Sequence, residues 1–107
     1  MDLKKLTTDL KDANAAAMQA STSGEDGGSC NLDSLYVTLP VRYSQKIAAA
    51  FEQAGMRLDK RPFKGTSRFV GINHSGQGCL RTQGVEAASK LLQSRGWDCF
   101  HVWYQMD

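Results

Sequence analysis

The sequence predicts one α+β domain, and three observations carry this prediction. Apolar residues recur at three- and four-residue spacing in three segments, which is typical of amphipathic helices. Four shorter segments are apolar or alternating and are bounded by Gly or Pro, which is typical of strands. The chain has 107 residues, a length that favours a single domain with one core.

The first helix is predicted over residues 2–20, where one narrow apolar stripe is formed by Leu3, Leu6, Leu10, Ala13 and Ala17. A helix this short is marginal alone, so the stripe should dock on another surface. Residues 21–31 are rich in Gly, Ser and Asp and lack periodicity, which indicates a loop. We therefore divide the chain into a helical arm at 1–21, a linker at 22–31 and a body at 32–107.

The body begins with an alternating strand at Leu35–Leu39, which Pro40 ends. A helix follows at about 42–54, and Gly55 suits the position after a helix, where a positive φ is required. A strand at 56–61, a turn at 62–65 containing Pro and Gly, and a strand at 68–72 come next.

Residues 73–79 form a glycine-rich loop, the last helix runs over about 80–95 with Gly96 as its stop, and a strand follows at 97–105. The order strand–helix–strand–strand–helix–strand is that of a ferredoxin-like body. Right-handed crossovers place both of its helices on one face of a four-stranded antiparallel sheet. The predicted fold is this α+β body with an extra N-terminal helix.

The last strand is apolar on both faces. One row consists of Phe100, Val102 and Tyr104, and the other of Trp97, Cys99, His101 and Trp103. Helices on one side would leave one row uncovered. The N-terminal helix, a second copy of the chain or a target protein could each supply the cover.

The glycine-rich loop is a candidate anion site, because a loop before a helix aims backbone N–H groups at one point. The residues assigned to it are Asn73, His74, Gly76, Gln77, Gly78, Arg81 and Thr82. Neither a complete dinucleotide fingerprint nor a P-loop is present. A tight turn whose glycines supply positive φ is the alternative, and the two interpretations are compatible.

The hairpin between the second and third strands is basic, and Phe63 and Phe69 are interleaved with its charges. Such a pattern suits stacking of single-stranded RNA, but a solvated edge protected by charge is the favoured interpretation. The candidate partner-binding residues are Arg57, Lys60, Arg61, Lys64, Arg68, Trp103 and Tyr104.

Composition narrows the remaining classes. A net charge of +2 is too small to indicate nucleic-acid binding by itself. Three cysteines without close spacing, no signal peptide and no long apolar run favour the cytoplasm and predict no membrane association. No metal-ligand spacing is present, so neither metal nor cofactor is expected. A thiol or hydrolase pair of His74 and Cys79 lacks an orienting group, and we expect no enzyme.

Three short motifs resemble those of a family of small phage and prophage proteins. They are GSCNLD at 28–33, GQGCLRT at 76–82 and WYQMD at 103–107, against Gly-Thr-Cys-Asn-Phe-Asp, Gly-Gln-Gly-x-Arg and Tyr-Tyr-Gln-Met-Asp in the family. The conservative departures are Ser29, Leu32 and Trp103. The resemblance implies a phage accessory protein and assigns no catalytic residue.

The function expected from this resemblance is binding and inhibition of a host protein in the bacterial cytoplasm, such as a component of CRISPR or another immune system. The alternative is a module that sequesters a nucleotide or another phosphorylated ligand at the loop of residues 76–82. A nucleic acid is the less favoured partner, and homodimerisation is left open.

Overall fold

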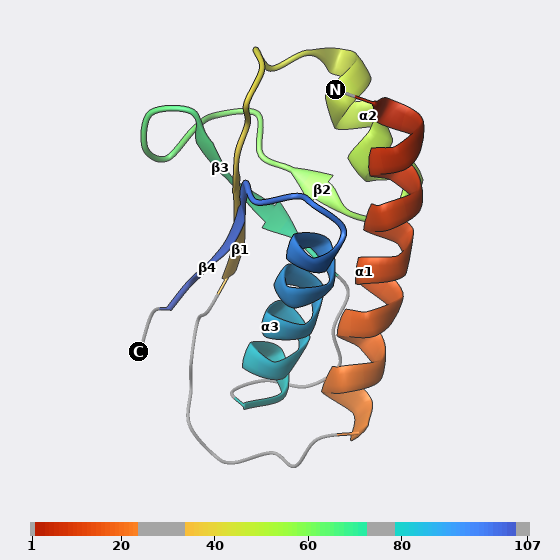
Figure 1. Ribbon diagram of the computed structural model, residues 1–107. Helices are drawn as coiled ribbons and strands as arrows, with labels where there is room; N and C mark the ends of the chain where they lie inside the picture. The colour runs from red at the N-terminus through yellow and green to blue at the C-terminus, as the bar shows by residue number, and fades with distance from the viewer. Residues whose placement is uncertain (1, 24–33, 73–78, 105–107) are drawn as a thin grey trace.

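The computed structural model describes residues 2–23, 34–72 and 79–104 (Figure 1). Its elements are α1 (Leu3–Ser23), β1 (Ser34–Thr38), α2 (Gln45–Gln53), β2 (Arg57–Leu58), β3 (Ser67–Gly71), α3 (Cys79–Ser94) and β4 (Phe100–Trp103). The strands form one antiparallel sheet in the order β2-β3-β1-β4. The predicted ferredoxin-like arrangement with an N-terminal helix is confirmed.

Two strands are shorter than predicted, because the chain uses its backbone groups elsewhere. β2 has two residues, and beyond it the hairpin forms an isolated bridge between Lys64 and Ser67. β4 begins at Phe100, since the N–H of Trp97 donates to the carbonyl of Leu92 and closes the end of α3. Gly55 and Gly96 follow their helices with φ of 82° and 92°, as predicted.

The core lies between the sheet and the helices. Alternation along the strands turns Leu35 and Val37 of β1, Val70 of β3 and Phe100 of β4 toward this side, and all are buried. The helices contribute the buried side chains Ile47, Ala50, Phe51, Val85, Ala88 and Leu92. The rings of Phe51 and Phe100 lie 6.1 Å apart, which joins α2 to β4.

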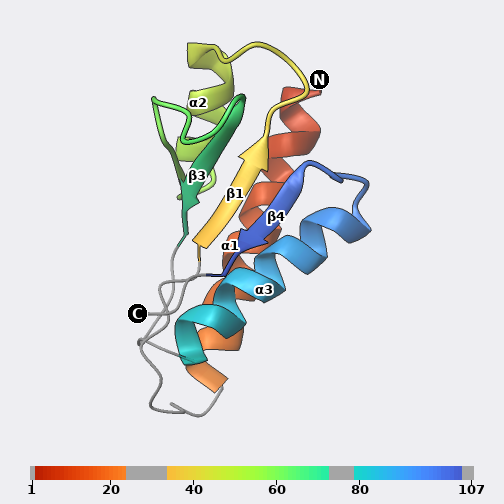
Figure 2. The ribbon, with the colours of Figure 1, turned by 90° about the vertical axis from the view of Figure 1, so that its left-hand side faces the viewer.

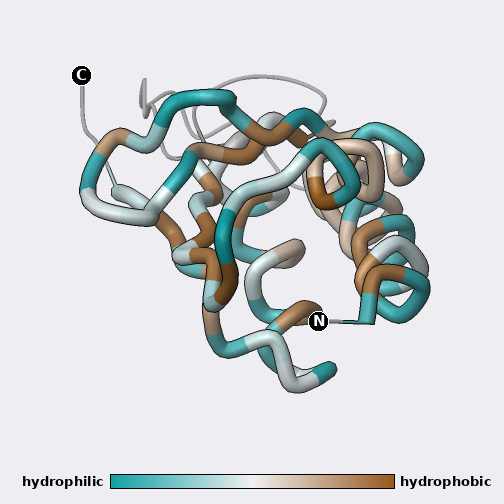
Figure 3. The backbone as a smooth tube through the Cα atoms, turned by 90° about the horizontal axis from the view of Figure 1, so that it is seen from above, coloured by the Kyte–Doolittle hydropathy of each residue, from teal (hydrophilic) through white to brown (hydrophobic). Residues whose placement is uncertain are grey.

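The apolar stripe of α1 belongs to the same core. Leu6, Leu10, Ala13 and Ala17 are at most 1% exposed, and Leu3 packs beside them. Helix α1 contacts α3 and α2, and so lies on the helical side of the sheet (Figures 1 and 2). Viewed from above, hydrophobic and hydrophilic residues alternate around its turns (Figure 3). The stripe therefore docks within the chain, and α1 does not cover the opposite face of the sheet.

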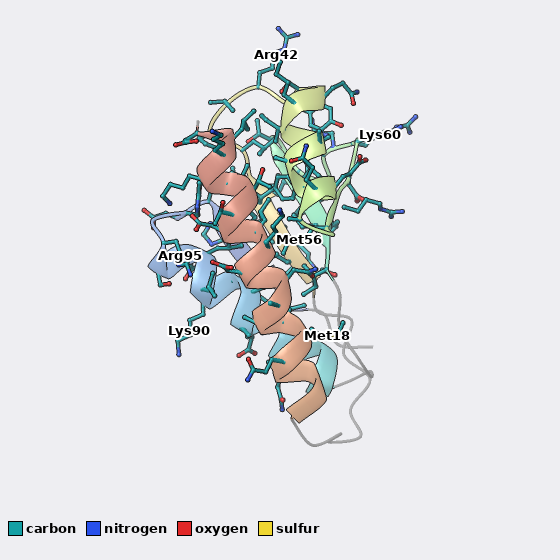
Figure 4. All side chains as sticks on the ribbon, turned by 90° about the vertical axis from the view of Figure 1, so that its right-hand side faces the viewer. Met18, Arg42, Met56, Lys60, Lys90 and Arg95 are labelled. Atoms are coloured by element: carbon teal, nitrogen blue, oxygen red, sulfur yellow. The ribbon has the colours of Figure 1, made fainter. Side chains whose placement is uncertain are left out.

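A buried carboxylate fixes α1 to the end of α3. Asp9 is 4% exposed and accepts hydrogen bonds from Lys5 Nζ at 2.8 Å, Arg95 Nη1 at 2.7 Å and Trp97 Nε1 at 2.7 Å. Arg95 also bonds Asp12 at 3.0 Å, and lies beside α1 in Figure 4. We call Lys5, Asp9, Arg95 and Trp97 the polar joint.

The surroundings of Asp9 act on its pKa in opposite directions. Burial alone would raise it, but the hydrogen bonds from Lys5, Trp97 and Arg95 outweigh burial, and the pKa is lowered. Every carboxylate oxygen of Asp9 therefore has a charged or N–H donor, as a buried ion requires.

Candidate binding face

The side of the sheet away from the helices carries a cluster of aromatic side chains. The register pairs Tyr36 with Phe69 on β3 and with His101 on β4, which places all three on this side, and Trp103 follows His101 by two residues. Phe63 joins them from the β2–β3 hairpin, 4.1 Å from Phe69. We call these five residues the open face, onto which Figure 2 looks.

The sequence assigned Trp97 and Cys99 to the same row as His101 and Trp103, and this assignment is wrong. Both lie before the start of β4 and pack against the core, and the indole of Trp97 donates to Asp9. The reason is the turn at residues 98–99, which interrupts the alternation that a longer strand would have continued.

The rings of the open face support one another in a fixed arrangement. Phe63 stacks on Phe69 at an interplanar angle of 15°, and Trp103 meets Phe63 edge-on at 5.3 Å. Tyr36 lies at the centre, 5.5 Å from Phe63 and 5.4 Å from His101. Offset and edge-to-face contacts at these distances are favourable. All five side chains remain partly exposed, and Trp103 is 41% exposed.

A groove of about 400 Å³ opens on this face between the hairpin and β4. Its aromatic lining is Tyr36, Phe63, His101 and Trp103, and Lys64 lies on the hairpin side. Thr38 and Ser67 add polar groups and share a hydrogen bond of 2.8 Å. A groove with an apolar lining and a few polar groups is the usual form of a binding site.

Positive charge gathers on the hairpin, where Lys64 lines the groove, and Arg57 and Lys60 line a second pocket beside α2. Arg57, Lys60, Arg61 and Lys64 are all exposed, and we call them the basic flank. The side chain of Arg57 is 84% exposed and lies 4.0 Å from Asp59, the acidic residue of this segment. In Figure 4, Lys60 extends away from the body at the outer side of α2.

Arg68 differs from the other predicted partner-binding cations. It is half-buried, and its guanidinium lies 4.2 Å from the ring centre of Tyr43 and donates to the backbone carbonyls of Asp59 and Lys60. Arg68 therefore ties the hairpin to the chain before α2. Tyr104, the last predicted partner-binding residue, is 63% exposed just beyond β4.

The predicted anion site falls mainly outside the described residues, which leave out Asn73, His74, Gly76, Gln77 and Gly78. Arg81 lies in the first turn of α3, and Thr82 follows it, half-buried. Of the pair weighed as a thiol or hydrolase site, His74 also lies outside the described residues, whereas Cys79 is the first residue of α3.

Burial raises the pKa of the Cys99 thiol, which disfavours its thiolate. No three His, Cys, Asp or Glu side chains of the described part come together as metal ligands. None of its helices combines the length and apolar character that crossing a bilayer requires.

Sequence reasoning named Phe63 and Phe69 as candidate stacking residues, but it missed Tyr36 and did not join these rings with His101 and Trp103 in one surface. The sequence did carry a signal for Tyr36. It stands between Leu35 and Val37 and makes the first strand apolar on both faces, as the last strand is.

Comparison with known proteins adds nothing to this geometry: no protein family, curated protein or solved structure matches the chain.

Proposed function

We propose that this chain is a non-enzymatic binding module, a phage accessory protein that attaches to a macromolecule of the host through the open face and blocks its action. The observation that supports this proposal is the partly exposed aromatic cluster on the side of the sheet that none of the described helices covers, in which Trp103 is 41% exposed. A folded chain gains little stability from an indole left in water, whereas exposed aromatic patches commonly mark interaction sites. Trp, Tyr and Arg also dominate the energetics of such sites.

The inhibitory role rests on the resemblance to phage accessory proteins. A host immune component is the target class that this resemblance favours, and a target protein is the expectation from sequence. Sequestration of a phosphorylated ligand at residues 76–82 stays the alternative. Mass spectrometry of small molecules released from the purified protein tests that alternative, since a co-purified nucleotide would favour it.

The test of the proposed function compares three proteins in capture from host lysate and in cells. They are the wild type, Trp103→Ala, and Val41→Ala as a control, because Val41 has the same exposed fraction of 41% but lies before α2. We expect wild type and Val41→Ala to capture the same host component and to restore plating of a phage that the host defence restricts. Trp103→Ala should do neither. Equal capture and plating by all three would contradict the proposal.

A further inference from the structure

We infer that the open face binds a single strand of nucleic acid, with its bases against the aromatic cluster and its phosphates along the basic flank. This inference rests on the proposed function only in taking the open face as the binding surface. The inference goes beyond the proposed function by naming the molecule that the open face binds. From sequence, a solvated edge was the favoured interpretation of the hairpin. The structure adds that Phe63 and Lys64 of this hairpin line a groove together with aromatic side chains of β1 and β4.

The composition of the open face suits unpaired bases. Four of its five rings line one groove, and they come from β1, β4 and the hairpin, on one side of one sheet. Tyr, Phe, Trp and His are the side chains on which unpaired bases stack. Since every base has a π face, a platform of this kind accepts bases of any sequence. The hydroxyl groups of Thr38 and Ser67 lie within the same groove and can bond base edges.

The hairpin beside the open face carries a net positive charge. From Arg57 to Lys64 the hairpin carries four exposed cations and one carboxylate, and Lys64 is part of the groove itself. On the opposite side, beyond β4, Glu86 and Lys90 offset each other near His101. Lys64 therefore gives the groove a cationic edge on the hairpin side, and Arg57 and Lys60 continue the positive charge along the hairpin toward α2. This direction suits a phosphate backbone that passes the bases at Lys64 and leaves the groove along the hairpin.

The geometry of the open face favours a single strand over a duplex. All three helices lie on the far side of the sheet, so none can enter the major groove of a duplex from the open face. Bases inside a duplex expose only their edges, whereas stacking on Tyr36 or Trp103 requires an unpaired base. RNA and single-stranded DNA share this chemistry, and the experiment separates them.

The experiment measures binding of a labelled mixed-sequence oligonucleotide of about 12 nucleotides, a length within the range that one such module covers. It is offered as single-stranded RNA, as DNA of the same sequence and as the annealed duplex. We expect at least one single strand to bind more tightly than the duplex. Trp103→Ala should weaken binding by about 5- to 150-fold, the range for losing one stacked base, while Trp103→Phe should retain most of the affinity.

The chain carries an internal reporter for the same titration. Of its two tryptophans, Trp103 lies on the open face and Trp97 in the polar joint. Unlabelled oligonucleotide should quench the fluorescence of the wild type and leave that of Trp103→Phe, which retains Trp97 alone, nearly unchanged.

A salt titration tests the basic flank. Lys64→Ala should lower the slope of log affinity against log salt by about 0.7, the value for one phosphate contact with a single strand. The matched control is Lys46→Ala, which removes another exposed cation, from α2 on the helical side. We expect that control to keep the wild-type slope.

Three results would overturn the inference. They are absence of binding to either single strand, binding undiminished in Trp103→Ala, or equal effects of Lys64→Ala and Lys46→Ala. Circular dichroism first verifies that each variant is folded. If capture of a nuclease-treated host protein is lost in Trp103→Ala while no oligonucleotide binds, the occupant is a protein; the proposed function then stands and this inference is wrong.

Discussion

The two faces of the sheet are built from the same strands but from different kinds of side chain. Toward the helices stand Leu35, Val37 and Val70, which are buried at 4% exposure or less. Toward solvent stand Tyr36, Phe69 and Trp103, which remain partly exposed. Aliphatic chains interlock at the density of a protein interior, whereas rings hold their positions through contacts with one another. One pleated surface thus has a buried aliphatic side and a partly exposed aromatic side.

The contrast between the two faces requires that the helix-facing side supplies most of the stability. Phe100→Ala should lower the free energy of unfolding by about 3–5 kcal/mol, because the ring is 1% exposed and leaves a cavity. Phe69→Ala on the open face should cost less than half as much, since its ring is already partly in water. Urea denaturation of the two variants measures the difference, and equal losses would remove the distinction between the faces.

The contribution of α1 to the stability of the helical side can be tested separately. Leu10→Ala should lower the free energy of unfolding by about 2–5 kcal/mol, because Leu10 is fully buried against the core. Met18→Ala on the same helix should change it by about 0.5 kcal/mol or less, since Met18 is 39% exposed. Thermal and urea unfolding report both values. A Leu10→Ala protein as stable as the wild type would show that α1 is not held by its stripe.

The polar joint gives a smaller effect that depends on pH. Asp9→Asn should cost about 1.5–3 kcal/mol at neutral pH, the range for hydrogen bonds to a charged group. The folded-state pKa of Asp9 is lowered, so its contribution is fully present above the ordinary value of 3.8 and is lost as pH falls through the folded-state pKa. The stability difference between wild type and Asp9→Asn should therefore shrink in acid.

Urea unfolding at pH 7 and at about pH 3, below the ordinary carboxyl pKa, measures this change. Asp12→Asn serves as the control, because Asp12 is 47% exposed at its side chain and makes only the outer contact with Arg95. A difference between Asp9→Asn and wild type that stays constant with pH would contradict the assignment.

The smallest effect on stability is expected at the most exposed ring of the open face. Trp103→Ala should change the free energy of unfolding by about 1 kcal/mol, the size of an aromatic pair contact. Acrylamide should quench Trp103 in the folded wild type more strongly than Trp97, which Trp103→Phe isolates. Equal quenching of both proteins would place Trp103 under cover and remove the open face as a binding surface.

The parts of this structure that a sequence can predict are those with local periodicity. The stripe of α1, the glycines after α2 and α3 and the order of elements all follow from spacing or from single-residue backbone preferences. The open face depends on pairing between distant strands, since only the register of Tyr36 with Phe69 and His101 brings those rings together. Phe63 reaches them through an irregular hairpin that no periodicity describes.

The polar joint illustrates a different limit. Asp9 follows Leu6 by three residues and so falls on the apolar stripe, where a charge contradicts the pattern. Its partners Arg95 and Trp97 lie at the other end of the chain, and their proximity depends on how α1 crosses α3. A charge that interrupts an apolar stripe is nevertheless a signal that sequence reasoning can use.

The polar joint joins residues that are far apart in the chain, and this bears on how the molecule folds. Asp9 is 86 residues from Arg95 and 88 from Trp97 in the chain, so these bonds close a loop containing both other helices and three strands. Contacts of such long range form slowly, because the intervening chain must first be ordered. We therefore expect α1 to complete its docking late in folding, after its nearer contacts with α2 have formed. Before Arg95 and Trp97 reach Asp9, the stripe of Leu6 and Leu10 is expected to be held less firmly, and an apolar surface exposed at that stage favours aggregation.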